Sequence, residues 1–270
     1  MSMNRRQFIR FAGLSTLLGV GGGTAAAKML WQVEPPGSQF TVNKEGLTGQ
    51  QWAMVVDMYA FKSPDQIQKC IDACHKVHNV PQFGNPKDEI KWLWTDSFGH
   101  VFPGQESKYM EEGIETMPFF ALCNHCENPP CVRVCPTKAT FKMPNGIVAM
   151  DYHRCIGCRF CMAGCPFGAR SFNWKDPRLV LQETNYNREY PTRGIGVVEK
   201  CTFCVERLDK GLIPACVEAA KDFKGLMFGD LKDPNSEVRE LLKKNYTIRR
   251  KTELGTEPKV YYIIRGGEHV

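Results

Sequence analysis

Residues 155–166 read Cys155-Ile-Gly-Cys158-Arg-Phe-Cys161-Met-Ala-Gly-Cys165-Pro166, a run with the spacing C-x2-C-x2-C-x3-C-P. A related run with the spacing C-x2-C-x4-C-x3-C-P lies upstream and contains Cys123, Cys126, Cys131 and Cys135. A third group, C-x2-C-x11-C, contains Cys201, Cys204 and Cys216, and a short C-x3-C contains Cys70 and Cys74. These four groups hold all thirteen cysteines of the chain.

The two longer runs have the spacing of iron–sulfur ligands. A C-x2-C-x2-C loop presents three thiolates to one [4Fe–4S] cubane, and the fourth cysteine of the run reaches a second cubane. Backbone N–H groups of such a loop point at the sulfurs and help to set the reduction potential. Pro136 and Pro166 follow the fourth cysteines, where a fixed φ and a missing N–H end the local turn. The two runs therefore predict two neighbouring cubanes with exchanged ligands, and a chain that carries electrons.

Two other uses of cysteine have to be weighed. Zinc sites built from C-x2-C pairs close at four ligands per metal and do not require the longer run. Disulfide frameworks are typical of small exported proteins, whereas thirteen cysteines gathered into tight loops of a 270-residue chain fit that class poorly. Iron–sulfur ligation is the interpretation that the spacings favour.

Length and charge set broad limits. A chain of 270 residues can form one large domain or two small ones, and its apolar fraction of 43% is ordinary for a globular protein. The formal charge is +6, of which Arg5, Arg6 and Arg10 supply three. Because a cubane with four thiolates is anionic, bound clusters would offset the remaining positive charge. The basic balance therefore does not indicate a nucleic-acid partner.

The N-terminus has the pattern of an export signal. Asn4-Arg5-Arg6-Gln7-Phe8-Ile9 is followed by a weakly hydrophobic, glycine-rich stretch and by Ala25-Ala26-Ala27. This pattern predicts a twin-arginine signal peptide over residues 1–27 with an A-x-A-like cleavage site. The stretch falls short of the roughly 20 strongly apolar residues of a stable transmembrane helix, although an uncleaved signal could tether the protein. We expect a periplasmic protein, exported folded, at the outer face of the cytoplasmic membrane.

Parts of the chain repeat. The segments that begin at Cys131 and Cys161 share the pattern C-x3-C-P-x-x-A with a phenylalanine shortly after it. Apolar segments that end in Asp, at residues 52–57 and 146–151, precede two of the cysteine regions and are predicted strands. The repeat predicts an α+β fold of two ferredoxin-like [4Fe–4S] modules.

The modules have expected boundaries. One is centred on residues 119–194 and holds two clusters. The other is split between residues 50–80 and 195–232. A loop-rich insertion, residues 82–118, separates the first part of the split module from the intact one.

The C-terminal extension, residues 233–270, should contain regular structure. Residues 236–244 have apolar side chains on one helical face and a serine at the start. Residues 259–264 are β-branched and aromatic, as in a strand. We therefore expect one helix and one strand there.

Taken together, the motifs resemble those of the four-cluster ferredoxin subunits of dimethyl-sulfoxide-, tetrathionate- and polysulfide-reductase-type complexes. The resemblance extends from Trp52 to about Ile264. It rests on Cys123-Asn-His-Cys126, on Cys155-Ile-Gly-Cys158-Arg-Phe-Cys161, and on Lys200-Cys201-Thr-Phe-Cys204 with Pro214-Ala-Cys216. It implies an electron-transfer subunit of a membrane-bound respiratory complex, without catalytic residues of its own.

In that family each cluster takes three cysteines from one motif and the fourth from another. Carried over to this sequence, the resemblance implies three complete ligand sets, with twelve cysteines as iron ligands. They are Cys123, Cys126 and Cys131 with Cys165 for cluster 1; Cys155, Cys158 and Cys161 with Cys135 for cluster 2; and Cys201, Cys204 and Cys216 with Cys74 for cluster 3.

A fourth cluster site of the family is incomplete in this chain. Pro64 and Ile67 stand where two of its cysteines are expected, and Ala220 stands where the last one would be. Only Cys70 remains. Because the losses affect a single site, the resemblance implies three [4Fe–4S] clusters, and a split module that keeps one cluster and loses one.

The missing site is the one that faces the catalytic subunit in the molybdopterin reductases. The segment from Cys70 to Pro81 is similar to the periplasmic ferredoxin subunit of the transmembrane redox complex associated with dissimilatory sulfite reductase. This implies a relay between an integral membrane quinone-reactive subunit and a multihaem cytochrome c, linked to sulfite or sulfate respiration. The alternatives are the electron-transfer subunit of a molybdopterin reductase or periplasmic hydrogenase, and a scaffold with degenerate clusters, which the intact motifs disfavour.

The segment Cys70-x3-Cys74-His75 has two further interpretations. It is a variant of the c-type haem attachment motif C-x-x-C-H, which would withdraw Cys74 from cluster 3. Otherwise Cys70 is a free thiol, either reactive or buried as a small hydrophobic residue.

Five basic residues lie next to cysteines in the sequence: Lys138, Arg154, Arg159, Arg170 and Lys200. They either raise the potentials of neighbouring clusters or are ordinary solvated charges. Which of the two holds depends on their exposure, so both interpretations stay open at this point.

Overall fold

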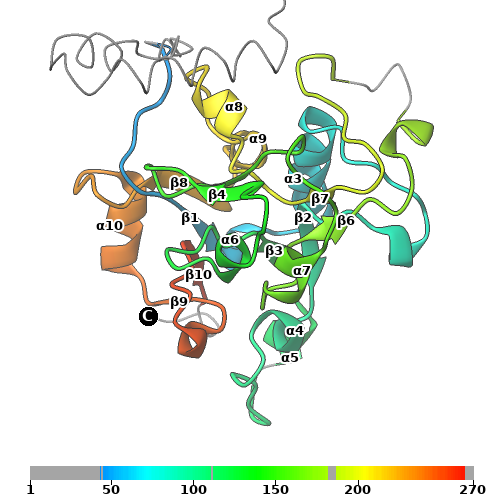
Figure 1. Ribbon diagram of the computed structural model, residues 1–270. Helices are drawn as coiled ribbons and strands as arrows, with labels where there is room; N and C mark the ends of the chain where they lie inside the picture. Colours follow the sequence, from blue (N-terminus) through cyan, green and yellow to red (C-terminus); the bar gives the residue numbers. More distant parts are fainter. Residues whose placement is uncertain (1–42, 44, 111, 182–186, 265–270) are drawn as a thin grey trace, which may run out of the picture. The chain divides into compact units, whose positions relative to one another are not determined.

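The largest sheet has four strands in the order β8–β1–β10–β9. In this computed structural model residues 43, 45–110, 112–181 and 187–264 are described. Strand β1 (Trp52–Asp57) pairs antiparallel with β8 (Leu226–Asp230) and parallel with β10 (Val260–Ile263), and β10 pairs with β9 (Thr247–Ile248). The predicted strands at residues 52–57 and 259–264 are thus confirmed, and they lie side by side (Figure 1).

Three antiparallel two-stranded sheets complete the β-structure. They are β2 (Leu93–Asp96) with β3 (Phe119–Leu122), β4 (Thr140–Lys142) with β5 (Val148–Met150), and β6 (Ser171–Phe172) with β7 (Val198–Glu199). Strand β5 confirms the strand predicted at residues 146–151, although the observed strand is shorter.

Two of the described helices, α3 (Pro64–Val77) and α10 (Glu237–Lys244), are longer than five residues. The short helices are α4 (Phe98–Val101), α5 (Glu112–Thr116), α6 (Pro130–Arg133), α7 (Phe160–Ala163), α8 (Val205–Leu208) and α9 (Ala215–Ala219). Helices this short are not stable in isolation, so packing has to hold them. Among the described residues, no helix has the length and apolar character that crossing a membrane requires.

Alternate residues of β1 face two different cores. Met54 and Val56 lie in the main core, whereas Ala53 and Val55 pack in a second core beneath α10. This alternation follows from the two-residue period of a strand. The main core also contains most of the buried cysteines, so the thiols lie among apolar side chains.

Helix α10 confirms the helix predicted at residues 236–244. Val238, Leu241 and Leu242 pack together on one side of it, as their spacing predicts. Ser236 precedes the first turn, and its hydroxyl accepts a hydrogen bond from Arg239 N at 3.3 Å and donates one to Asp230 O at 2.7 Å. Ser236 therefore ties the start of the helix to the end of β8.

The expected modules can be located in the described residues. The described residues between Asn43 and Ile264 belong to one compact unit. Helix α3 packs against α9, which brings residues 50–80 and 195–232 together. The 82–118 segment supplies β2 and core residues such as Trp92 and Phe102. The division into two modules stays a prediction, and the signal peptide expected over residues 1–27 lies outside the described residues.

The sequence repeat does not extend to the sheets. Strand β1 lies between two partners in the four-stranded sheet, whereas β5 belongs to a hairpin with β4. The repeated sequence therefore gives similar local segments but different strand pairing, because pairing depends on which segments come together in three dimensions.

Replacement of the capping serine should weaken the protein measurably. We expect Ser236→Ala to lower the free energy of unfolding by about 1 kcal/mol, since an N-terminal N–H of the helix loses its acceptor. Thermal unfolding followed by circular dichroism should show a midpoint lower by about 2–4 °C for a chain of this size.

Ser63→Ala is the matched control. Ser63 precedes α3, but its side chain makes no capping hydrogen bond there. Its replacement should leave the unfolding midpoint within about 1 °C of the wild-type value. Equal effects of the two substitutions would contradict the capping role of Ser236.

Candidate iron–sulfur sites

The three C-x2-C loops share one backbone feature. The residue just before the second cysteine is left-handed in each, with φ of 42° at His125, 71° at Gly157 and 53° at Phe203. Such a φ costs a residue with a side chain on the order of 1 kcal/mol. At Gly157 an added Cβ would lie 2.3 Å from the carbonyl oxygen of Gly196, so glycine is required there. At His125 and Phe203 this cost has to be offset by another interaction.

A short helix carries the third cysteine of each loop. Cys131, Cys161 and Cys216 each stand at the second position of their helix, in α6, α7 and α9 respectively. In the third loop, Phe203 N donates to Cys201 Sγ at 3.4 Å and Ala215 N donates to Cys204 Sγ at 3.4 Å. Backbone N–H groups thus already point at the sulfurs, as they do around iron–sulfur clusters.

The structure brings the four cysteines expected for cluster 1 around a single cavity. Its lining includes Cys123, Cys126, Cys131 and Cys165, together with Phe167 and Arg170. Burial, with the nearby thiol of Cys123, raises the pKa of Cys126 to about 12. Neutral thiols are therefore favoured here until a metal displaces their protons.

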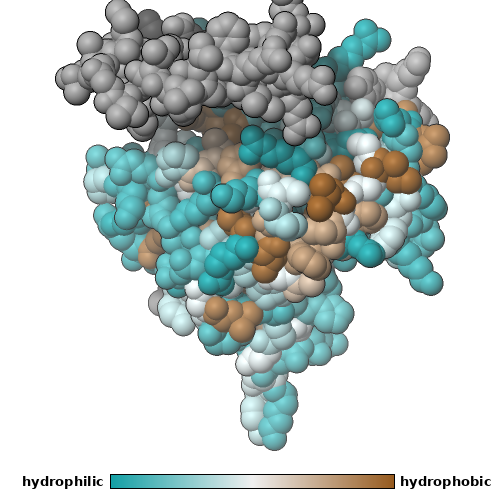
Figure 2. Space-filling model, viewed as in Figure 1, coloured by the Kyte–Doolittle hydropathy of each residue, from teal (hydrophilic) through white to brown (hydrophobic). Residues whose placement is uncertain are grey.

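The four cysteines expected for cluster 2 line another cavity, Cys135, Cys155, Cys158 and Cys161. Only Cys161 is buried, and the other three are partly exposed. The surrounding surface is apolar, because Ile156, Phe160 and Ile195 are 68%, 59% and 61% exposed. Figure 2 shows hydrophobic side chains gathered over α7 and the β6–β7 pair.

The four cysteines expected for cluster 3 are all buried, and three of them, Cys74, Cys201 and Cys216, lie in the main core; the fourth is Cys204. Burial and the three neighbouring thiols together raise the pKa of Cys74 well above its usual range. Cys74 comes from α3, far in sequence from the others. Because Cys74 is grouped with these thiols, the arrangement argues against a haem attached through Cys74.

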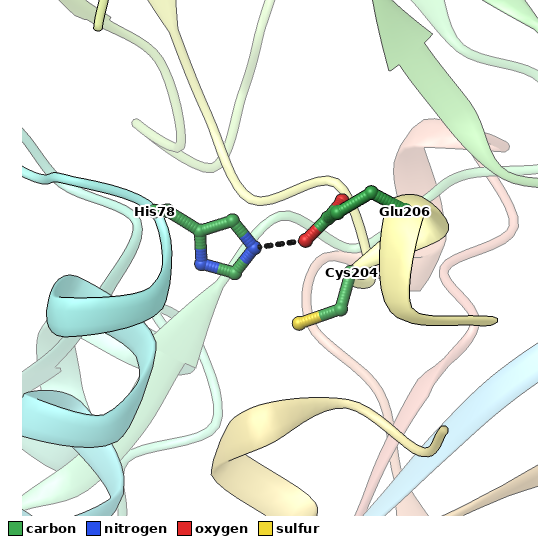
Figure 3. A group of neighbouring side chains, drawn as sticks. All are labelled: His78, Cys204 and Glu206. Carbon is green, nitrogen blue, oxygen red and sulfur yellow. Dashed lines mark hydrogen bonds and ion pairs between the residues drawn. The ribbon is translucent and has the colours of Figure 1, made fainter. Parts of the chain in front are cut away.

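A histidine and a glutamate adjoin this third set (Figure 3). His78 Nε2 lies 2.8 Å from Glu206 Oε1, and Nδ1 lies 2.8 Å from the carbonyl oxygen of Cys74. Since a carbonyl only accepts, Nδ1 is the donor to Cys74, and Nε2 faces the Glu206 carboxylate. Ligand atoms of His78, Cys204 and Glu206 lie within 4.8 Å of one another. Because Cys204 also belongs to the third set, these residues form the surroundings of that set.

Sequence reasoning did not find Glu206, nor the buried ion pair of Arg193 with Glu199. Arg193 Nη2 lies 2.6 Å from Glu199 Oε2, and both side chains are fully buried. Glu199 also accepts from Trp92 Nε1 at 2.9 Å. One sequence feature could have indicated these residues: Glu199 and Glu206 each lie two positions from a predicted ligand cysteine.

Apolar packing occupies the region where the resemblance places a fourth cluster. Pro64 and Ile67 begin α3, and Cys70 lies on the same helix one turn before Cys74. Ile67, Cys70 and Ala220 are buried in the main core. A helix therefore stands in place of a ligand loop, and Cys70 is a buried thiol as one of the two open interpretations predicts.

The side chains present fit iron–sulfur clusters. Four thiols around one point suit zinc or an iron–sulfur cluster. Arg170 Nη2 and His125 Nε2 are buried donors next to the cysteines, and neither has an acidic or hydroxyl partner among the described residues. Such donors fit an anionic sulfur site, where thiolates and, in a cubane, sulfides accept hydrogen bonds.

Comparisons with known proteins identify chains that are similar to this one. Residues 115–183 match the family described as a 4Fe-4S dicluster domain. The chain is 41% identical to the Hdr-like menaquinol oxidoreductase iron-sulfur subunit 1 of Archaeoglobus fulgidus, over 98% of this chain and 100% of that protein. It is 34% identical to the menaquinone reductase iron-sulfur cluster-binding subunit of Nitratidesulfovibrio vulgaris, over 80% and 89% of the two chains. It is 31% identical to a subunit of the tetrathionate reductase of Salmonella typhimurium, over 97% and 89%.

The fold and the grouped thiols define a ferredoxin-type protein with [4Fe–4S] clusters. The chain belongs to the family of iron–sulfur electron-transfer subunits of menaquinol oxidoreductase and of dimethyl-sulfoxide-, arsenate- and tetrathionate-reductase complexes.

Cys70 should resist alkylation in the folded, cluster-loaded protein. Its thiol is buried, and burial raises its pKa to about 12, so that hardly any reactive thiolate is present at pH 8. Iodoacetamide treatment followed by peptide mass spectrometry should find Cys70 unmodified in the native protein and fully modified after unfolding. Rapid native labelling of Cys70 would contradict its burial and identify a reactive thiol.

Proposed function

We propose that the chain relays electrons through three [4Fe–4S] clusters. The cysteines expected for clusters 1, 2 and 3 are called set 1, set 2 and set 3. The observation that carries the proposal is that each set gathers four thiols from segments distant in sequence. When bound, the clusters supply the one-electron chemistry. The chain supplies thiolates, N–H donors and a water-poor interior, and no active site of its own.

Set 1 is central in this relay. Cys161 of set 2 interacts electrostatically with Cys131 of set 1, and Cys201 of set 3 interacts with Cys123 of set 1. The order is therefore set 2, set 1, set 3. Since the cysteines of set 2 are the most exposed, set 2 is the end at which a partner approaches most closely.

The partners that we propose are an integral membrane quinone-reactive subunit and a multihaem cytochrome c. Support for the first comes from relatives that are named as menaquinol and menaquinone enzymes. The cytochrome and a link to sulfite or sulfate respiration rest on the resemblance of the segment from Cys70 to Pro81. A periplasmic location rests on the signal pattern of residues 1–27, so the relay would work at the outer face of the membrane.

The second candidate function is that of an electron-transfer subunit of a molybdopterin reductase. It is favoured by the similarity to a subunit of tetrathionate reductase. The apolar packing of Ile67, Cys70 and Ala220 argues against it, because it removes the cluster site that faces such a catalytic subunit. A count of clusters separates the two candidates.

Iron content tests the number of clusters. The anaerobically loaded wild-type protein should contain about twelve irons and as many acid-labile sulfides per chain, three cubanes in all. Cys74→Ser should lose about a third of the iron together with one set of reduced-state EPR signals. About sixteen irons in the wild type would contradict three clusters and revive the molybdopterin candidate.

Cys70→Ser is the matched control, since Cys70 lies on the same helix one turn from Cys74. It should retain the full iron content, because Cys70 belongs to no complete set. Loss of a cluster in Cys70→Ser would show that this thiol is a ligand.

The apolar surface around set 2 should be the site of partner contact. Within the assembled complex, Ile156→Asp should slow reduction of the clusters by a quinol analogue at least about tenfold, since a charge at the centre of an apolar contact removes a binding hot spot. The clusters' visible absorbance reports the rate.

Tyr246→Asp is the control for this substitution, because Tyr246 is 85% exposed and lies outside the set 2 loops. It should leave the rate unchanged. Equal rates for wild type and Ile156→Asp, with unchanged iron content, would exclude this surface as the docking site of the quinone-reactive subunit.

A further inference from the structure

Two buried cations next to the cysteines have no acidic partner among the described residues. Arg170 is 4% exposed and Lys200 is 0% exposed. Arg193 and Lys259 are paired with Glu199 and Glu127, respectively. Arg250 is also buried without an acidic partner among the described residues, and it donates to the carbonyl oxygens of Val101 and Phe167. Burying an unpaired charge is costly, so unpaired buried cations indicate an anion that the protein itself does not provide.

Arg170 lies between set 1 and set 2. Its side chain lines the cavity of set 1, and Nη1 donates to Thr140 Oγ1 at 3.0 Å. Nη2 has no oxygen or nitrogen partner among the described residues, and the guanidinium forms side-chain hydrogen bonds with the thiols of Cys131 in set 1 and Cys161 in set 2. The guanidinium therefore interacts with ligands of two neighbouring sets at once.

Lys200 occupies the equivalent place between set 1 and set 3. Its ammonium donates to the carbonyl oxygen of Val148 and to that of Cys201, the latter at 2.7 Å. Val148 lines the cavity of set 1 and Cys201 belongs to set 3, so the ammonium lies beside both sets.

The remaining three basic residues are different. Lys138, Arg154 and Arg159 are exposed, so water and salt screen their charges. A buried cation is screened much less, and it stabilises the extra electron of a reduced cluster. The three exposed residues are therefore ordinary solvated charges, whereas the two buried residues can raise the potentials of neighbouring clusters.

We propose that Arg170 and Lys200 set the potentials of the relay, and that together they make the central cluster, in set 1, the one of highest potential. The inference rests on the proposed function, because it requires clusters in all three sets. Each gap between neighbouring sets contains one buried cation, and the central set alone adjoins both. An electron therefore resides preferentially on the central cluster between a quinone, which exchanges two electrons, and a haem, which exchanges one.

Redox titration monitored by EPR tests the proposal on loaded protein. Arg170→Gln should lower the ratio of reduced to oxidised cluster at a fixed potential at least tenfold in sets 1 and 2, and should leave set 3 unchanged. A tenfold change in this ratio corresponds to about 59 mV for one electron. Lys200→Met should produce the same loss in sets 1 and 3 and not in set 2. Signals are assigned through Cys126→Ser, Cys158→Ser and Cys204→Ser, each of which alters one set.

Charge-conserving and exposed variants complete the design. Arg170→Lys and Lys200→Arg should restore most of the potential, and Arg159→Gln, an exposed change beside Cys158, should alter any ratio less than twofold. Shifts that are uniform over the three sets, or absent although iron content is unchanged, would overturn the inference.

A measurement on the wild type covers the case in which the neutral variants fail to load. During reductive titration the first signal should belong to set 1 and be magnetically isolated, and spin coupling should appear only as its neighbours are reduced. First reduction of set 2 or set 3 would overturn the inference. Absence of three clusters from the iron count would instead contradict the proposed function.

Discussion

The convergence of thiols from distant parts of the chain is the constraint on which the structure depends. Cys74 on α3 meets cysteines from residues 201–216, and Cys165 meets the loop that begins at Cys123. Helices of four or five residues and strands of two or three have little stability of their own. Ligands shared between loops would hold these short elements in place, so that cluster binding and folding are coupled.

Around the thiols the protein handles buried charge in two ways. The Arg193–Glu199 pair is internally compensated, and Trp92 donates to the same carboxylate. Arg170 and Lys200 have thiols and carbonyls for neighbours instead. The first arrangement fixes the position of the segments, since breaking a buried pair costs about 3–5 kcal/mol. The second arrangement leaves positive charge available to anionic cofactors. The buried cations would then influence the reduction potentials of the proposed clusters.

Exposure changes along the row of sets. The cysteines of set 3 are all buried beside the His78–Glu206 pair, whereas three of the four in set 2 are partly exposed within an apolar surface. Exposure to water and hydrogen bonding both influence cluster potential. One fold thus provides an enclosed end, a centre with two adjoining cations and an end accessible to a partner.

The cysteine spacing by itself determined the class of protein, because a C-x2-C-x2-C-x3-C-P run already specifies the local loop that a cubane requires. Hydrophobic patterns likewise predicted β1, α10 and β10, since their periods are local. Only the tertiary structure decided that β1 lies beside β10, that Arg170 and Lys200 are buried while Arg159 is exposed, and that His78 meets Glu206. Burial and contact depend on segments far apart in the sequence, and no local spacing records which of those segments come together.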